Sequence, residues 1–183
     1  MPKKKLSLAT LLNKMTARKR AVCRRVYDDF KDSFESLPGG LHNHQVWRGG
    51  YRDHVEEVMN IGCLLYIGLN SKRKLPFSLG DTLFVLFLHD MDKLLRFEKV
   101  DNKVIQKHAY GEHFVKKIGS LLRRTYHYQL SADELNALQY THGEGKDYSP
   151  TQRVMKPLTA LVHCCDIISA RIWFDYGRNE KNW

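Results

Sequence analysis

The apolar run at residues 82–88, "TLFVLFL", constrains the fold most, because it ends directly in the polar sequence "HDMDK". An apolar run of this kind belongs in the core, and Ser78 followed by Asp81 is typical of a helix N-terminus just before it. His89, Asp90 and Asp92 therefore follow a buried helix. Burying an unpaired carboxylate there would be strongly unfavourable, so a cation or a metal ion is expected beside these groups.

Apolar residues recur at helical spacing in most of the remaining chain, and no segment shows the alternation of a strand. A length of 183 residues fits one domain with its own core. The sequence therefore predicts an all-α, single-domain helical bundle. The predicted helices lie at residues 6–35, from about 52, from 79 into the "HDMDK" sequence, at 111–124, at 131–140 with a capping box in "SADE", and from Pro157.

Positive charge is concentrated at the N-terminus of the chain. The formal net charge is +10, yet residues 1–27 contain no acidic residue and the rest of the chain is nearly neutral. Such an arm can bind a polyanion such as nucleic acid through counterion release, or it can be a solvated helix face; both interpretations stay open. Its basic residues are Lys3, Lys4, Lys5, Lys14, Arg18, Lys19, Arg20, Arg24 and Arg25.

Cysteine usage and hydropathy indicate a cytoplasmic protein. The four cysteines form no CxxC pair, which argues against a disulfide framework and against a cysteine-ligated zinc site. No apolar run reaches the ~18 residues that a membrane span needs, so no membrane partner is expected. The basic N-terminus has only a short apolar stretch, which more Lys and Arg follow in place of the small-residue cleavage site of a signal peptide.

Ligand-type residues occupy core positions in separate predicted helices. His54 lies near the start of one helix, His142 at the end of another, and Asp166 inside the apolar segment "LTALVHCCDIISA". An isolated carboxylate in that segment would be unfavourable unless a cation accompanied it. Together with His89 and Asp90, these residues predict a site for a divalent ion.

Lys93 adds a positive charge to this constellation. It follows the pair His89–Asp90 by one helical turn, on the same face. An ammonium there can hold a phosphate oxygen beside a metal ion. The pattern therefore points to phosphate chemistry, and the absence of a GxxxxGK loop argues against ATP-driven reactions.

The order His54, then His89 with Asp90, then Asp166 resembles the HD-domain superfamily of metal-dependent phosphohydrolases. The resemblance covers about residues 36–175. Within it, "SLPGGLHNHQVWRGGYRDHVEEV" and "LHDMDK" are similar to the "LPAA…HHA…GGLLxHT" and "LHDIGK" motifs of the HD-domain 3'-to-5' exoribonuclease group. "THGEGKDYSP" and "ALVHCCDIISA" are similar to the "HHG…YGSP" and "D…DA" of that group.

Two positions depart from the family pattern. Asp92 replaces a glycine, and Thr141 stands where the first histidine of a pair is expected. A second metal ion would then draw on His142 and on His108 of "KHAYGEH", which is similar to the "HPEIG" of HD-GYP phosphodiesterases; His113 resembles the "GH" of the exonucleases. The alternative is a mononuclear site in which His108 and His142 bind phosphate.

The resemblance implies three parts of the chain. These are a basic amphipathic N-terminal helix at residues 1–35, an HD-type catalytic domain at 36–175 with its metal site in the bundle core, and a C-terminal tail at 176–183. The oligonucleotide-binding barrel that accompanies the exonucleases has no room in a chain of this length.

The resemblance also implies a reaction and roles for individual residues. One or two ions of Mn, Fe, Zn, Co, Ni or Mg would activate water toward phosphorus. Asp90 or a nearby carboxylate would take the proton, and Lys93 with Arg48 would stabilise the developing charge. His44 would face a nucleotide substrate. The favoured activity is that of a phosphomonoesterase or triphosphohydrolase. The alternatives are a nuclease, a cyclic-nucleotide phosphodiesterase, or a domain that binds nucleotide or nucleic acid without turnover.

The remaining histidines and aromatic residues have ordinary interpretations. Surface or hydrogen-bonded core positions are the prediction for His127 and His163, and also for whichever of His42 and His44 does not face the substrate. Packing is favoured over base stacking for the large aromatic side chains. These are Trp47, Trp173 and Phe174, and the role of Asp92 is left open.

Overall fold

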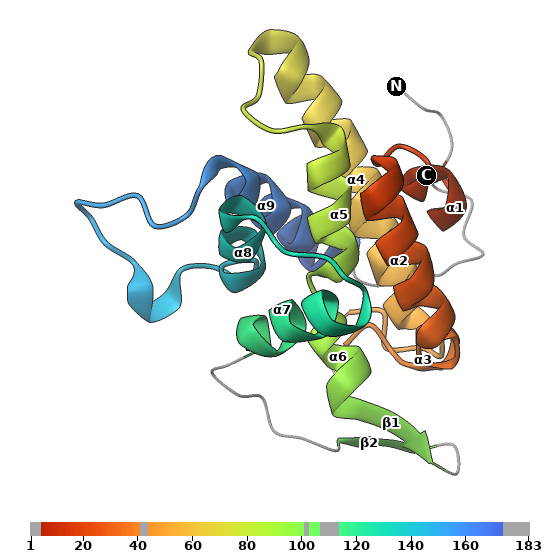
Figure 1. Cartoon of the computed structure of the whole chain (residues 1–183). Coiled ribbons are helices and arrows are strands. Elements are labelled where there is room, and N and C mark those ends of the chain that lie inside the picture. The colour runs from red at the N-terminus through yellow and green to blue at the C-terminus, as the bar shows by residue number, and fades with distance from the viewer. Residues whose placement is uncertain (1–4, 41–43, 101–102, 107–113, 174–183) are drawn as a thin grey trace.

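Three helices, α4, α5 and α9, pack pairwise against one another and form the centre of the molecule (Figure 1). They span Gly50–Lys72, Leu79–Leu88 and Pro157–Arg171. The computed structural model describes residues 5–40, 44–100, 103–106 and 114–173. The predicted all-α class is confirmed.

The outer helices cover this centre from two sides. Figure 1 shows α1, α2 and α3 on one side of α4 and α5, and α7 and α8 on the other, with α6 leading into a small hairpin. In the hairpin, β1 pairs antiparallel with β2, and Phe97 lies opposite Gln106. The bounds are α1 Leu8–Leu12, α2 Ala17–Asp29, α3 Lys31–Ser36, α6 Met91–Arg96, β1 Phe97–Val100, β2 Lys103–Gln106, α7 Phe114–Thr125, α8 Ala132–Gln139 and the 3-10 turn η1 Gly145–Asp147.

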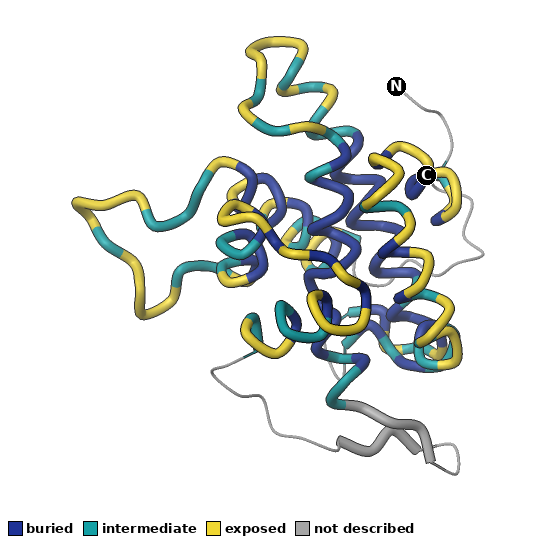
Figure 2. The backbone as a smooth tube through the Cα atoms, in the orientation of Figure 1, coloured by how far each residue is buried: buried dark blue, intermediate teal, exposed yellow. Residues whose placement is uncertain are grey.

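A stack of aromatic rings joins α3, α4 and α5. The ring of Phe34 lies 4.9 Å from that of Tyr51 and 5.7 Å from that of Phe87, and all three side chains are buried. Figure 2 shows that buried residues gather where the central helices meet. Burying each ring stabilises the fold by roughly 1.5–3 kcal/mol. This packing fixes the start of α4 next to the end of α5, and so brings His54 close to His89.

Lys19 connects three helices from a largely buried position. Its ammonium forms ion pairs with Asp81 at the start of α5 and, at 2.8 Å, with Glu134 at the start of α8. Both acids also complete capping boxes, one with Ser131, where a capping box was predicted, and one with Ser78, where only a helix start was predicted. One basic residue of the N-terminal arm is therefore used inside the bundle.

The prediction of a single helix over residues 6–35 is wrong, because this segment forms three helices. The side chain of Thr16 accepts a hydrogen bond from the backbone N–H of Lys19 and starts α2, and Phe30 separates α2 from α3. Side-chain caps compete locally with helix continuation, while the apolar spacing runs on across the break.

The remaining helix boundaries agree with the prediction more closely, and the hairpin was not predicted. Helices begin at Gly50, Ala132 and Pro157, close to the predicted starts. Residues 111–113 of the predicted helix at 111–124, and the predicted tail at 176–183, lie outside the described residues. Two strands of four residues each are too short to show a recognisable alternation.

Packing, not cross-linking, stabilises the described part of the chain. All four cysteines are free thiols, as predicted, and only Cys164 is exposed. The described helices include none that is both long enough and apolar enough to cross a membrane.

Two glycines of α4 make a matched test of the loop that precedes it. A Cβ on Gly50 would lie 1.9 Å from the carbonyl oxygen of Gln45, whereas nothing lies within 4 Å of a Cβ on Gly68. We expect Gly50→Ala to lower the free energy of unfolding by about 2 kcal/mol or more, because the loop must move. Gly68→Ala should raise it by about 0.5–1 kcal/mol, since alanine favours the helix. Urea unfolding measures both; equal effects would contradict this packing.

Candidate metal centre

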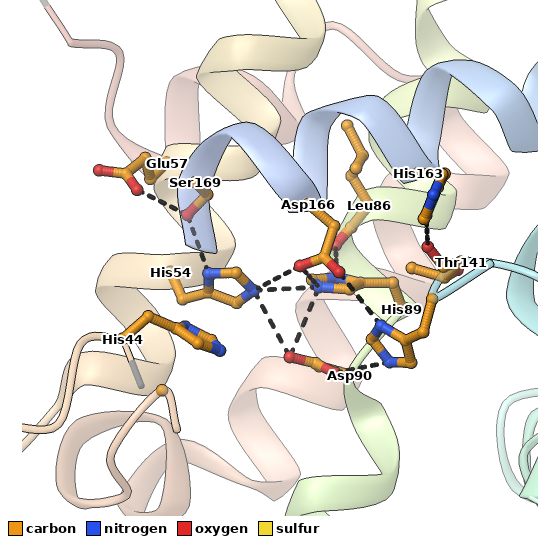
Figure 3. A network of polar contacts seen from close by, with 12 residues as sticks. His44, His54, Glu57, Leu86, His89, Asp90, Thr141, His163, Asp166 and Ser169 are labelled. Atoms are coloured by element: carbon orange, nitrogen blue, oxygen red, sulfur yellow. Dashed lines mark hydrogen bonds and ion pairs between the residues drawn. The ribbon is translucent and has the colours of Figure 1, made fainter. Parts of the chain in front are cut away.

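His89 and Asp90 lie in the turn where α5 ends. The helix stops at Leu88, His89 caps it, and α6 starts at Met91. Both side chains are buried, with 1% of His89 and 2% of Asp90 exposed. The predicted core helix thus delivers its polar residues at its end, and the interruption lets both side chains turn to one side (Figure 3).

His54 of α4 and Asp166 of α9 meet this turn in the bundle core (Figure 3). The Nε2 atoms of His54 and His89 are 3.1 Å apart, and Asp166 Oδ1 lies 3.3 and 3.6 Å from them. Asp90 Oδ2 lies 3.5 Å from each of the two Nε2 atoms. Donors about 2.1 Å from one ion are about 3.0–3.4 Å apart in octahedral or tetrahedral geometry, so the spacing fits a divalent metal.

The hydrogen bond of His89 to the backbone determines which of its ring nitrogens is free to bind a metal ion. Its Nδ1 lies 2.7 Å from the carbonyl oxygen of Leu86, which can only accept, so Nδ1 carries a proton. The Nε2 of a neutral His89 is then a lone-pair acceptor that faces two carboxylates and His54. Acceptors that converge in a buried space require a cation between them, and one ligand atom each from His54, His89 and Asp166 lies within 4.8 Å of the others.

Both carboxylates of the cluster are ionised. Burial alone would raise their pKa values, but nearby cations and hydrogen bonds outweigh it. The ammonium of Lys93 holds the pKa of Asp90 well below its usual value, and the hydrogen bond from His142 does the same for the pKa of Asp166. Ionised carboxylates offer only acceptor oxygens, which is the state that a metal ligand needs.

His142 joins the cluster from the loop after α8. Its Nδ1 lies 3.1 Å from Asp166 Oδ2, and its Nε2 lies 3.5 Å from Asp90 Oδ1. Hydrogen bonds to Asp166 and Asp90 raise the pKa of His142 to about 10. The preceding Thr141 is buried, and its hydroxyl donates to the carbonyl of Ala137 at 2.6 Å, so it points away from the cluster.

A cavity of about 290 Å³ opens beside the cluster, and basic side chains line it together with the carboxylates. Lys93 lies there, and its ammonium donates hydrogen bonds to Asp90 and to the carbonyl of Gly39. A phosphate group suits such a lining, because charge-assisted hydrogen bonds from Lys and Arg are strong. Besides Asp90, Asp92 and Asp166, the polar lining residues are His44, Lys93, Arg96, His142, His163 and Arg171.

The structure places the other predicted site residues differently. His44 lines the cavity, whereas Arg48 is exposed in the loop before α4 and is not part of the lining. His108 lies outside the described residues. Asp92 is buried and forms an ion pair with Arg96 at the cavity wall. This contact suggests a structural role for Asp92, which the sequence left open.

Several residues near the cluster were not predicted. Arg96 and Arg171 line the cavity, and so does His163, whose Nδ1 donates to the carbonyl of Thr141. Behind His54, Ser169 lies 3.0 Å from its Nδ1 and 2.6 Å from Glu57, a buried carboxylate (Figure 3). No local pattern marks these residues, because each is defined by contacts between distant parts of the chain.

The comparisons with known proteins add no relative. No family model matches the chain, and neither the curated proteins nor the solved structures include a match. The resemblance to the HD-domain superfamily stays a prediction from the quoted motifs. The geometry of the cluster and of its cavity is therefore what supports a function.

The carboxyl of Glu57 should make stability depend on pH. Burial, opposed in part by Ser169 and Lys5, raises the pKa of Glu57 from 4.5 to about 7. Between these values the folded state binds more protons than the unfolded state, so the free energy of unfolding falls as pH rises, by about 3 kcal/mol. In Glu57→Gln this part of the decline should disappear in denaturant unfolding at about pH 5 and pH 8.

The matched control is Asp28→Asn, which removes an exposed carboxylate. This variant should keep the full decline of the wild-type protein, because the side chain that it changes is exposed to solvent in the folded state. If Glu57→Gln and the wild-type protein show parallel pH profiles, Glu57 is not the source.

Proposed function

We propose that this chain is a divalent-metal-dependent phosphohydrolase that cleaves a phosphoester of a nucleotide. The observation that carries the proposal is the convergence of His54, His89, Asp90 and Asp166 beside a cavity whose lining includes Lys93 and Arg171. The resemblance of the same four residues to the HD-domain pattern supports it independently.

These four residues would hold the ion. Their nitrogen and oxygen donors suit Mn, Fe, Zn, Co, Ni or Mg. A divalent ion bound there supplies a Lewis acid for a phosphate oxygen and lowers the pKa of water. A second ion would draw on His142 and on the predicted ligand His108; without one, His142 remains a proton donor toward the substrate.

The chain itself provides the groups that bind and orient a phosphate. Lys93 and Arg171 present positive charge to the cavity, where a phosphate oxygen can accept from both. His142, protonated because of its raised pKa, can donate a proton to a leaving oxygen. The low pKa of Asp90 favours the role of ligand over that of proton acceptor, which narrows the role predicted from the sequence.

The size of the cavity favours a small substrate. A volume of about 290 Å³ lies at the lower end of the range for small-molecule sites. It suits the phosphate end of a nucleotide better than an enclosed polymer. Phosphomonoesterase or triphosphohydrolase activity therefore ranks first, and nuclease or cyclic-nucleotide phosphodiesterase activity ranks second.

A substrate panel tests the reaction. Nucleoside mono- and triphosphates, cyclic nucleotides, and single-stranded RNA and DNA are incubated with the protein and Mn²⁺, Mg²⁺, Co²⁺ or Zn²⁺. We expect release of inorganic phosphate or triphosphate from a mononucleotide. Release of 5'-mononucleotides from a polymer would favour the nuclease, and no product with any metal would favour a binding domain.

Substitutions in the cluster test its residues. Asp90→Asn and Asp166→Asn should each lower kcat by at least roughly 10³-fold and reduce bound metal, because each removes an anionic ligand. Lys93→Ala should mainly raise KM, since it removes a phosphate contact. Elemental analysis, circular dichroism and steady-state kinetics measure these effects, with the exposed Asp28→Asn as control. Full activity in either aspartate variant would contradict the site.

A nucleic-acid-binding role is the second candidate, and a cationic surface on α2 and α7 favours it. Arg18 and Arg25 of α2 are exposed and reach the backbone carbonyls of His127 and Thr125. Thr125 and His127 lie just beyond two exposed arginines in the last turn of α7, Arg123 and Arg124. The basic residues of the predicted arm thus meet further positive charge from a distant segment.

A charge-removal experiment tests this surface. The triple variant Arg25→Gln, Arg123→Gln, Arg124→Gln should weaken binding to a single-stranded oligonucleotide and reduce the slope of log K against log salt by about 2. The matched control removes the same charge at an exposed basic cluster at the C-terminal end of α4, with Lys72→Gln, Arg73→Gln and Lys74→Gln. Equal losses in the two variants would indicate only a general charge effect.

A further inference from the structure

A buried polar network lies behind the proposed metal ligands, on the side away from the cavity. Its centre is Glu57 of α4, which is 2% exposed. One oxygen of this carboxyl, Oε1, lies 2.6 Å from Ser169 Oγ and 2.9 Å from Gln45 Nε2. Ser169 and Gln45 are also buried. Every donor and acceptor in such a place needs a partner, so the direction of each hydrogen bond can be deduced.

The direction of the hydrogen bond from Ser169 to Glu57 determines which ring nitrogen of His54 carries the proton. Oε1 of Glu57 is an acceptor, so the single hydroxyl proton of Ser169 points toward it. The oxygen of Ser169 then has only lone pairs left for His54 Nδ1, which lies 3.0 Å away. His54 must therefore carry its proton on Nδ1, and its Nε2 faces the metal site as a bare lone pair.

Gln45 determines the tautomer of His44 in the same way. Its amide nitrogen lies 2.9 Å from Glu57 Oε1 and 3.3 Å from Ser169 Oγ, so it donates to both. The reverse orientation of the amide would point its oxygen at two acceptors. Gln45 Oε1 therefore accepts from His44 Nδ1 at 2.7 Å, and the Nε2 of His44 is left bare. The ring of His44 lies beside His54, turned toward Asp90 (Figure 3).

The backbone around Gln45 is held in a rare conformation. Its φ is 41°, in the left-handed region that a residue with a side chain seldom adopts. Its carbonyl oxygen accepts a hydrogen bond from the N–H of Gly39 at 2.8 Å. The same oxygen lies close to Gly50, which is possible because Gly50 has no side chain. A strained residue persists when the surrounding structure over-determines it, and such residues cluster at functional sites. Here the unusual backbone conformation of Gln45 places its side-chain amide between Glu57 and His44.

We propose that Glu57 is a positioning residue that sets the tautomers of His54 and His44, through Ser169 and Gln45. One buried acceptor thus makes His54 a metal ligand and leaves His44 as a hydrogen-bond acceptor toward the cavity, able to take a proton from water or from a substrate hydroxyl. The first consequence rests on the proposed function, whereas the tautomers themselves do not. A protonated Glu57 fulfils the role equally well, provided that its proton sits on the other oxygen.

Histidine NMR tests the tautomers directly in the metal-free, full-length protein. Long-range ¹H–¹⁵N spectra at about pH 8, where ordinary imidazoles are neutral, distinguish the two tautomers. We expect the Nδ1–H form for both His54 and His44, with signals assigned by replacing one histidine at a time. An Nε2–H tautomer of His54 in the wild-type protein would overturn the proposal without any variant.

Two substitutions at one position separate the acceptor from the charge. Glu57→Met removes the acceptor, so the hydroxyl of Ser169 can turn to His54 Nδ1, and the Nε2–H tautomer should become populated. Glu57→Gln also removes the charge but keeps an amide oxygen as acceptor, so the wild-type tautomers should be retained. Unchanged tautomers in Glu57→Met would overturn the proposal. Ser169→Ala should also release the tautomer of His54, and it replaces Glu57→Met if that variant does not fold.

Metal affinity provides a separate readout. In titration calorimetry with Mn²⁺ alone, Glu57→Met should bind roughly 10- to 100-fold more weakly than the wild-type protein, while Glu57→Gln stays close to it. Equal affinities of Glu57→Met and the wild-type protein would overturn the positioning role. A wild-type protein with both expected tautomers but no Mn²⁺ binding would overturn the proposed function instead, and would leave the tautomer assignment intact.

Discussion

Convergent acceptors in an apolar bundle are the interaction on which the rest of the structure depends. Four groups that each present a lone pair or a negative charge meet within a few ångströms, between helices that otherwise meet mainly through apolar side chains. Their mutual repulsion is unfavourable unless positive charge lies among them. The structure supplies part of that charge from Lys93 and His142 at the edge, and the donor set is one that a divalent ion would complete.

The bundle holds these groups by two kinds of contact. Aromatic packing between Phe34, Tyr51 and Phe87 fixes the helices that carry His54 and His89. Hydrogen bonds to the outer nitrogens then fix each ring, to a backbone carbonyl for His89 and to Ser169 for His54. Rings that are restrained on the far side cannot rotate away from the site, and this is how surrounding residues commonly orient metal ligands.

Positive charge serves two purposes in this molecule. Inside, Lys19 ties α2 to α5 and α8, and Lys93 neutralises Asp90. Outside, arginines of α2 and α7 form a surface that a polyanion can reach. The basic residues near the N-terminus therefore do not all have the same role. Part of it stabilises the bundle, and the rest remains exposed to solvent.

The sequence by itself determined the all-α class, most helix starts, and the four residues of the cluster, because apolar spacing and capping residues are local and because buried His and Asp stand out in apolar segments. Only the tertiary structure decided the rest. The break of the first predicted helix, the hairpin, Arg171 in the cavity and the network of Glu57 depend on contacts across the fold. Ser169 meets Glu57 across 112 residues and Gln45 across 124, and periodicity carries no information about such pairs.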